Sequence, residues 1–188
     1  MVRVAVVEDE KTYSDELISY IRRYGREKNV LIDILLFRDG MEFKEYTDSS
    51  AERFDIVFMD IKMPCVSGLE AAKHLRETDP YVSIIFTTVM MQYATRGYEV
   101  DALDYMVKPI HYLNLSLKLD KAMTRIVRNK AIIALPAADG ALVRLSAADI
   151  FYVESRDHYA LFYTAKGNML KLISLSAVEE MFCEDGFL

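Results

Sequence analysis

Four short apolar runs in this sequence end in residues that suit metal or phosphate chemistry. The residues are an acidic pair, a lone aspartate, a threonine pair and a lysine: Glu8-Asp9, Asp60, Thr87-Thr88 and Lys108. In an open parallel α/β sheet, the carboxyl ends of all strands lie at one edge, where ligands bind. Carboxylates, a hydroxyl and an ammonium that meet at such an edge would suit a divalent cation and a phosphoryl group.

The carboxylates favour Mg²⁺ as the cation. Mg²⁺ takes oxygen ligands in octahedral geometry and is usually held by one or two carboxylates together with phosphate and water. We expect Asp9 and Asp60 to be direct ligands and Glu8 to hold a metal-bound water. The backbone carbonyl of Lys62 would add a further oxygen.

Asp60 is also the expected nucleophile, because a carboxylate can attack phosphorus and form an acyl phosphate. Lys108 would neutralise the added charge, and a threonine hydroxyl would bond a phosphoryl oxygen. Acidic residues at strand ends often only cap the next helix, but four matched strand ends favour a site. The predicted chemistry is phosphoryl transfer onto an aspartate.

The elements that must position these residues follow an alternating pattern over the first two thirds of the chain. Strands are expected at 2–7, 31–37, 55–59, 82–88 and 103–107, and helices at 11–27, 40–49, 67–77, 92–98 and 112–129. Alternation of this kind predicts parallel βαβ units with right-handed crossovers. The sequence therefore predicts an α/β fold, a doubly wound (βα)5 domain over residues 1–129.

Residues 130–188 follow a different pattern. Five short apolar runs, AIIAL, ALVRL, DIFYVES, YALFYT and NMLKL, are separated by turn signals rather than helices. This spacing predicts a small, mostly antiparallel β unit. One helix is expected at about 174–183, with Ser176 and Glu179 in capping-box spacing.

Composition excludes several classes of protein. The 188 residues are 52% hydrophobic and carry a net charge of −6, so no basic excess indicates nucleic acid. The two cysteines form no CxxC pair, which argues against zinc and disulfides and favours a reducing cytoplasm. The first residues, MVRVAVVEDE, are too short and too quickly acidic for a signal peptide, so we expect that they do not form one. No apolar run approaches the roughly 18 residues of a membrane span.

The phosphate-site residues also carry a resemblance. The phrases VVED, FMDIKMP-x-x-SG, IIFTT and LDYMVKP resemble the receiver domain of bacterial two-component response regulators over residues 2–128. The resemblance implies that Asp60 accepts phosphate from a sensor histidine kinase with Mg²⁺. It further implies that Thr88, or else Thr87, is the switch hydroxyl, that Tyr105 is the switch aromatic, and that Lys108-Pro109 is a cis peptide.

The C-terminal unit carries a second resemblance. DIFYVESRDHYALFYTAKG is similar to the start of the LytTR DNA-binding domain of LytR/AlgR-type regulators, which contacts DNA through loops. The resemblance implies that Ser155, Arg156 and His158 face promoter DNA. The four basic and eight acidic residues after Lys130 do not by themselves suggest it. The family module continues with further strands, so we expect a partial domain that binds DNA poorly.

The leading interpretation is a cytoplasmic response regulator that accepts a phosphoryl group, loses it by self-dephosphorylation, and homodimerises when phosphorylated. The alternative is a receiver that controls a protein-interaction or dimerisation module without direct DNA binding. A phosphohydrolase is disfavoured, because it needs an acid/base two residues after Asp60, where Lys62 stands.

Overall fold

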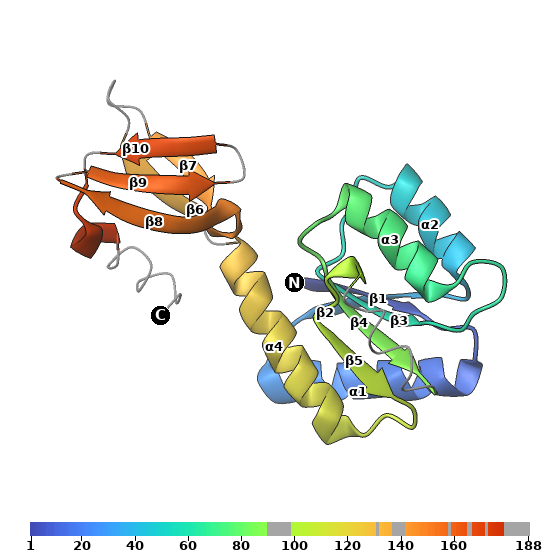
Figure 1. Cartoon of the computed structure of the whole chain (residues 1–188). Helices are drawn as coiled ribbons and strands as arrows, with labels where there is room; N and C mark the ends of the chain where they lie inside the picture. The colour runs from blue at the N-terminus through green and yellow to red at the C-terminus, as the bar shows by residue number, and fades with distance from the viewer. Residues whose placement is uncertain are drawn as a thin grey trace. The chain divides into compact units, whose positions relative to one another are not determined.

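The computed structural model describes residues 1–89, 99–130, 132–136, 142–157, 159–164, 167–171 and 173–178. The chain divides into two compact units, Met1–Met123 and Thr124–Leu188, and the division falls within one helix, α4 (Tyr112–Lys130). Both units are drawn in Figure 1.

The first unit is built on a parallel sheet of five strands in the order β2-β1-β3-β4-β5. The strands are β1 (Val2–Val7), β2 (Ile32–Phe37), β3 (Ile56–Asp60), β4 (Ser83–Thr88) and β5 (Asp104–Val107). All five predicted strands are present within one or two residues of their expected ends, and the doubly wound α/β class is confirmed.

Helices connect these strands and cover both faces of the sheet. They are α1 (Lys11–Lys28), α2 (Gly40–Ser49), α3 (Gly68–Thr78) and the first part of α4. In Figure 1, α2 and α3 lie on one side of the sheet and α1 lies on the other. The helix expected at 92–98 lies outside the described residues.

The core of this unit follows from the alternation of side chains along each strand. On the α2–α3 side, Val7, Met59 and Phe86 pack in one cluster with Phe43 and Leu69. The intervening residues face the other way and are also buried, because both faces of a parallel sheet are covered. Strands that are apolar throughout, such as Ile56–Met59, are the consequence.

Helix capping fixes where α2 and α3 begin. The carboxylate of Asp39 accepts hydrogen bonds from the backbone N–H groups of Met41 and Glu42 at the start of α2. Ser67 and Glu70 form a capping box at the start of α3. These bonds satisfy donors that have no partner within the helix.

The second unit contains two antiparallel sheets. Strands β6 (Ile132–Pro136) and β7 (Leu142–Ser146) pair with each other, and β9 (Tyr159–Thr164) lies between β8 (Ile150–Arg156) and β10 (Gly167–Lys171). This confirms the predicted small antiparallel β unit. Its core consists of Leu135, Leu145, Ala147, Ala160, Phe162 and Val178.

The predicted C-terminal helix is described only in part, and its cap differs from the prediction. Residues 175–178 are helical, and the Ser174 hydroxyl accepts a hydrogen bond from the Ala177 backbone N–H at 3.2 Å. Ser176 lies inside the helix, so the capping-box prediction for Ser176 was wrong at its first position. Glu179 lies outside the described residues.

None of the helices in the described part of the chain combines the length and the apolar character that crossing a bilayer requires.

Candidate functional site

The strand order places the acidic residues at the switch point of the sheet. From β1 the chain adds β2 on one side and β3 on the other, so the strand order reverses between β1 and β3. Glu8 and Asp9 follow β1, and Asp60 is the last residue of β3. Ligands of doubly wound sheets bind in the crevice at this point, outside the carboxyl ends of the strands.

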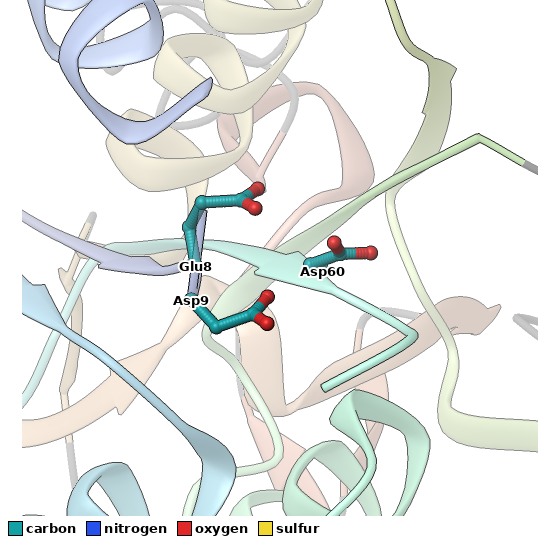
Figure 2. A group of neighbouring side chains, drawn as sticks. All are labelled: Glu8, Asp9 and Asp60. Atoms are coloured by element: carbon teal, nitrogen blue, oxygen red, sulfur yellow. The ribbon is translucent and has the colours of Figure 1, made fainter. Parts of the chain in front are cut away.

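The three carboxylates predicted from the sequence lie together there. Figure 2 shows Glu8, Asp9 and Asp60 with their side chains at one edge of the sheet. One oxygen from each lies within 4.8 Å of the others. Glu8 and Asp60 are buried, whereas Asp9 is exposed, so the cluster has one solvent-facing member.

Lys108 supplies the opposing charge. Its side chain is 1% exposed, and its ammonium donates hydrogen bonds to Asp60 Oδ2 at 2.6 Å and to Glu8 Oε1 at 2.8 Å. The contact with Glu8 joins residues 100 positions apart in the sequence. Glu8 directly follows β1, and Lys108 directly follows β5. A single ammonium therefore links the ends of β1, β3 and β5.

The electrostatics of the cluster follow from its burial. Burial raises the pKa of Glu8 to about 7, although Lys108 opposes this shift, and the charge of Asp60 raises it further. Burial alone would lower the pKa of Lys108, but its bonds to Asp60 and Glu8 outweigh burial and raise it. The ammonium is therefore held in its charged form beside Asp60.

The residues present fit a hard divalent cation. Glu8 Oε2 is buried and accepts no hydrogen bond from the residues that the structure describes, although it lies 2.7 Å from the Lys108 ammonium, whose bond is directed to Oε1. Three clustered carboxylates and one unfilled acceptor oxygen match the all-oxygen ligand set that Mg²⁺ prefers. The backbone N–H of Lys62 donates to Asp60 Oδ1 at 3.2 Å, which places this loop against the cluster.

The two threonines separate onto opposite faces of the sheet. Phe86 pairs with Tyr105 and Thr88 pairs with Val107, so the side chains of Thr88 and Tyr105 point to the same face. Thr88 is fully buried and shares a hydrogen bond with Tyr105, while burial raises the pKa of Tyr105. Thr87 pairs with Asp60 in register and points to the other face.

The loop after Asp60 is held close by Gly68. The backbone N–H of Gly68 donates to the carbonyl of Ile61 at 3.0 Å. A Cβ at Gly68 would lie 1.9 Å from the Asp60 carbonyl oxygen, so any side chain there would displace the end of β3 or the start of α3. Gly68 is the last residue of the phrase FMDIKMP-x-x-SG, but no role was predicted for it from the sequence.

Tyr13 is a residue that the sequence prediction missed. Its ring lies over the Lys108 ammonium, with the centroid 4.3 Å from Nζ. Tyr13 stands in the first turn of α1, on the helix that follows the acidic pair. Nothing in its spacing distinguishes it from an ordinary helix residue, because the contact depends on how α1 packs beside Lys108.

The residues expected to face DNA lie in the second unit. Ser155 and Arg156 are exposed at the end of β8, and Arg156 lies 3.9 Å from the Glu154 carboxylate. Asp157, which follows, has a left-handed backbone with φ 52°, as short hairpin loops often require. His158 lies outside the described residues.

Comparison with known proteins identifies the class that this fold and site define. Residues 4–120 match the family described as the response regulator receiver domain, and the chain belongs to that family. Receiver domains are regulatory modules of two-component systems rather than enzymes in the usual sense.

Two curated relatives show how the similarity is distributed along the chain. LytT of Bacillus cereus is 36% identical over 109 residues, which are 58% of this chain and 42% of that protein. The transcriptional regulatory protein YpdB of Escherichia coli is 24% identical over 178 residues, covering 88% of this chain and 70% of YpdB. The chain thus spans less than half the length of its LytT relative.

Solved structures agree with the fold of the first unit. The response regulatory domain of MrkE from Klebsiella pneumoniae has a TM-score of 0.59 and 25% identity, covering 66% of this chain and 98% of that one. TrrA of Thermotoga maritima, solved in complex with Mg²⁺ and BeF, has a TM-score of 0.56 and 28% identity. The match covers 65% of this chain and 99% of the TrrA chain.

Proposed function

We propose that the protein is a cytoplasmic response regulator that accepts a phosphoryl group on Asp60 from a sensor histidine kinase. The observation that carries this proposal is the environment of Asp60. Its carboxylate ends a central strand, lies 2.6 Å from a buried ammonium, and belongs to a cluster of three carboxylates at the switch point.

The residues of this chain would divide the work of transfer. The Lys62 N–H and the Lys108 ammonium hold the two oxygens of Asp60, which fixes the carboxylate. An oxygen of Asp60 attacks phosphorus, a P–O bond forms, and the P–N bond of the phosphohistidine breaks. The electron pair stays on the imidazole nitrogen, which then takes a proton. Hydrolysis of the acyl phosphate by water returns the carboxylate and inorganic phosphate, which is self-dephosphorylation.

Mg²⁺ would be held by Glu8, Asp9, Asp60 and the backbone carbonyl of Lys62. When bound, it supplies positive charge against the oxygens of the transferring group. The open acceptor Oε2 of Glu8 and the exposed carboxylate of Asp9 support this assignment. The relative TrrA was solved with Mg²⁺ and BeF.

Thr88 and Tyr105 would report the state of Asp60. Their hydrogen bond links the end of β4 to β5, and Thr88 follows the strand neighbour of Asp60 by one residue. A Thr88 hydroxyl that turns toward the phosphoryl group would leave Tyr105. The ring would then be free to move and to change the surface of β5 and α4, which would promote a homodimer.

The output is proposed to be transcriptional. We assign residues 1–129 to the receiver and 130–188 to part of a LytTR-type DNA-binding domain. The LytT relatives and the match to YpdB over 88% of this chain support the assignment. Ser155 and Arg156, exposed at the end of β8, and His158 would contact promoter DNA. A second candidate output is a protein-interaction or dimerisation module, which the acidic surplus of residues 131–188 favours.

Mapping the phosphoryl group tests the receiver function. The protein is incubated with Mg²⁺ and a small acyl phosphate, and the adduct is located by mass spectrometry. We expect about one phosphoryl group per chain on Asp60, none in Asp60→Asn, and wild-type labelling in Asp15→Asn, which removes an exposed carboxylate on α1. Stoichiometric labelling of Asp60→Asn would overturn the assignment.

DNA binding tests the transcriptional output. It is measured in this chain and in a protein that carries the complete output domain. Arg156→Ala should weaken binding to all DNA sequences. It should also reduce by about one the slope of the logarithm of the binding constant against the logarithm of the salt concentration. His158→Ala should reduce the preference for target over random DNA. Wild-type affinity in Arg156→Ala at two salt concentrations, together with full target preference in His158→Ala, would show that the DNA contacts lie at other residues. No binding of target DNA by the protein with the complete output domain would favour the protein-interaction output.

A further inference from the structure

The Lys108 ammonium is enclosed on three sides. An ammonium carries three N–H donors, and those of Lys108 have two carboxylate partners, Glu8 and Asp60. The remaining side is covered by the ring of Tyr13, whose centroid is 4.3 Å from Nζ. The Lys108 side chain is only 1% exposed, so bulk water has little access to the third donor.

The face of an aromatic ring attracts a cation, and the attraction is greatest where water is excluded. Tyr13 is half-buried, so its ring separates the ammonium from solvent on the α1 side. Its hydroxyl has no hydrogen-bond partner among the described residues. The ring, rather than the phenolic oxygen, is therefore the part of Tyr13 that acts on Lys108.

We propose that Tyr13 is a positioning residue for the reaction at Asp60: its ring face holds the Lys108 ammonium against Asp60 and keeps water away from it. This proposal rests on the proposed function of Asp60. The same ammonium would pair with the phosphoryl group after transfer. Tyr13 would then set how long the acyl phosphate survives, because a displaced ammonium leaves that group less shielded from water.

Substitutions that separate ring charge from ring shape test the proposal. Tyr13→Phe keeps the aromatic face and loses only the hydroxyl, so the lifetime of phosphorylated Asp60 should stay within about two-fold of wild type. Replacing Tyr13 with pentafluorophenylalanine keeps the ring shape and reverses the charge of its face. We expect the acyl phosphate to hydrolyse about three- to ten-fold faster in that variant and in Tyr13→Leu.

The outcomes distinguish positioning from packing. If pentafluorophenylalanine behaves like Phe and only Leu shortens the lifetime, the ring acts by packing and the proposal is overturned. Equal lifetimes in all four proteins would overturn it as well. Thermal unfolding of each variant confirms that the rates refer to folded protein.

A second readout keeps this inference separate from the function of Asp60. The ¹⁵N resonance of the Lys108 ammonium is measured in the unphosphorylated protein, together with the exchange of its protons with water. We expect slow exchange with Tyr13 or Phe, and faster exchange with pentafluorophenylalanine. If the exchange rates of the variants follow this pattern but the wild-type protein takes no phosphoryl label at Asp60, the proposed function is refuted and the ring contact stands. Identical exchange in all variants would refute the ring contact.

Discussion

At the scale of single residues, the site depends on one buried cation among three carboxylates. Lys108 opposes the repulsion of Glu8 by Asp60, but the burial of Glu8 outweighs the effect of Lys108. Glu8 carries the clearest sign of this balance, because burial raises its pKa to about 7 from a usual value of 4.5. The metal-free protein is therefore under electrostatic strain at neutral pH.

The strain predicts a pH dependence of stability. Between pH 4.5 and about 7, folded Glu8 keeps a proton that the unfolded chain has released. Its stabilising contribution is complete below pH 4.5 and is lost as the pH rises through about 7, by as much as about 3 kcal/mol. The raised pKa of Lys108 acts only at higher pH.

Denaturant unfolding of the metal-free protein at pH 5 and pH 8 measures this effect. Wild type should lose free energy of unfolding over this interval relative to Glu8→Gln, and Mg²⁺ should restore part of the loss at pH 8. All other titratable groups are common to the two proteins, so their contributions cancel in the comparison. Parallel curves for the two proteins would show that Glu8 ionises normally.

At the scale of elements, the site depends on how closely α3 approaches the end of β3. Gly68 is the first residue of α3, and the space for its side chain is already filled by the Asp60 backbone. The capping box of Ser67 and Glu70 fixes the same turn from the solvent side. The start of α3 and the end of β3 therefore form one closely packed corner beside Asp60.

A pair of glycine substitutions tests that corner. Gly68→Ala should lower the free energy of unfolding by about 2–4 kcal/mol and weaken Mg²⁺ binding, because the end of β3 must shift. Gly25→Ala in α1 is the matched control. Its Cβ would meet the Val30 carbonyl oxygen at 3.0 Å, a tight contact that a small shift relieves, whereas the contact at Gly68 would be 1.9 Å. Alanine is also the better helix former, so the loss should stay within about 1 kcal/mol. Similar losses in both variants would mean that helix propensity, not crowding at Asp60, decides the result.

At the scale of the whole molecule, exposed leucines on α4 indicate where two copies would meet. Leu113 and Leu117 are 77% and 67% exposed, and they stand four residues apart on one face of the helix. Val107 at the end of β5 is also exposed. A homodimer would bury these apolar side chains.

The predicted homodimer is tested by hydrodynamic size with and without beryllofluoride and Mg²⁺. Wild type should become dimeric when beryllofluoride is added, and Leu117→Glu should stay monomeric while still binding beryllofluoride at Asp60. Leu31→Glu, which changes another exposed leucine, before β2, should dimerise normally. A monomeric wild type in the presence of beryllofluoride would count against dimerisation as the response.

Much of this molecule was predictable because its chemistry lies at strand ends. The positions of Glu8, Asp60 and Lys108 after apolar runs were sufficient to place them at one edge of a parallel sheet. The Tyr13 contact was not predictable, since it depends on the packing of α1 beside Lys108. The cap of the last helix was misplaced because Ser174 and Ser176 both suit an N-cap, and only the backbone shows which hydroxyl meets a free N–H. The roles of Thr88 and Tyr105 stay predictions.

The long separation between Lys108 and its partners also has a consequence during protein synthesis. Asp60 and Glu8 precede Lys108 by 48 and 100 residues, so a ribosome adds Lys108 about 2–10 s after Asp60. Until then the nascent chain contains the acidic residues without their counter-charge, and β5 is absent from the sheet. Competence to receive a phosphoryl group would thus arise only after β5 and Lys108 have been made, and a kinase would not charge a receiver whose last strand is still being translated.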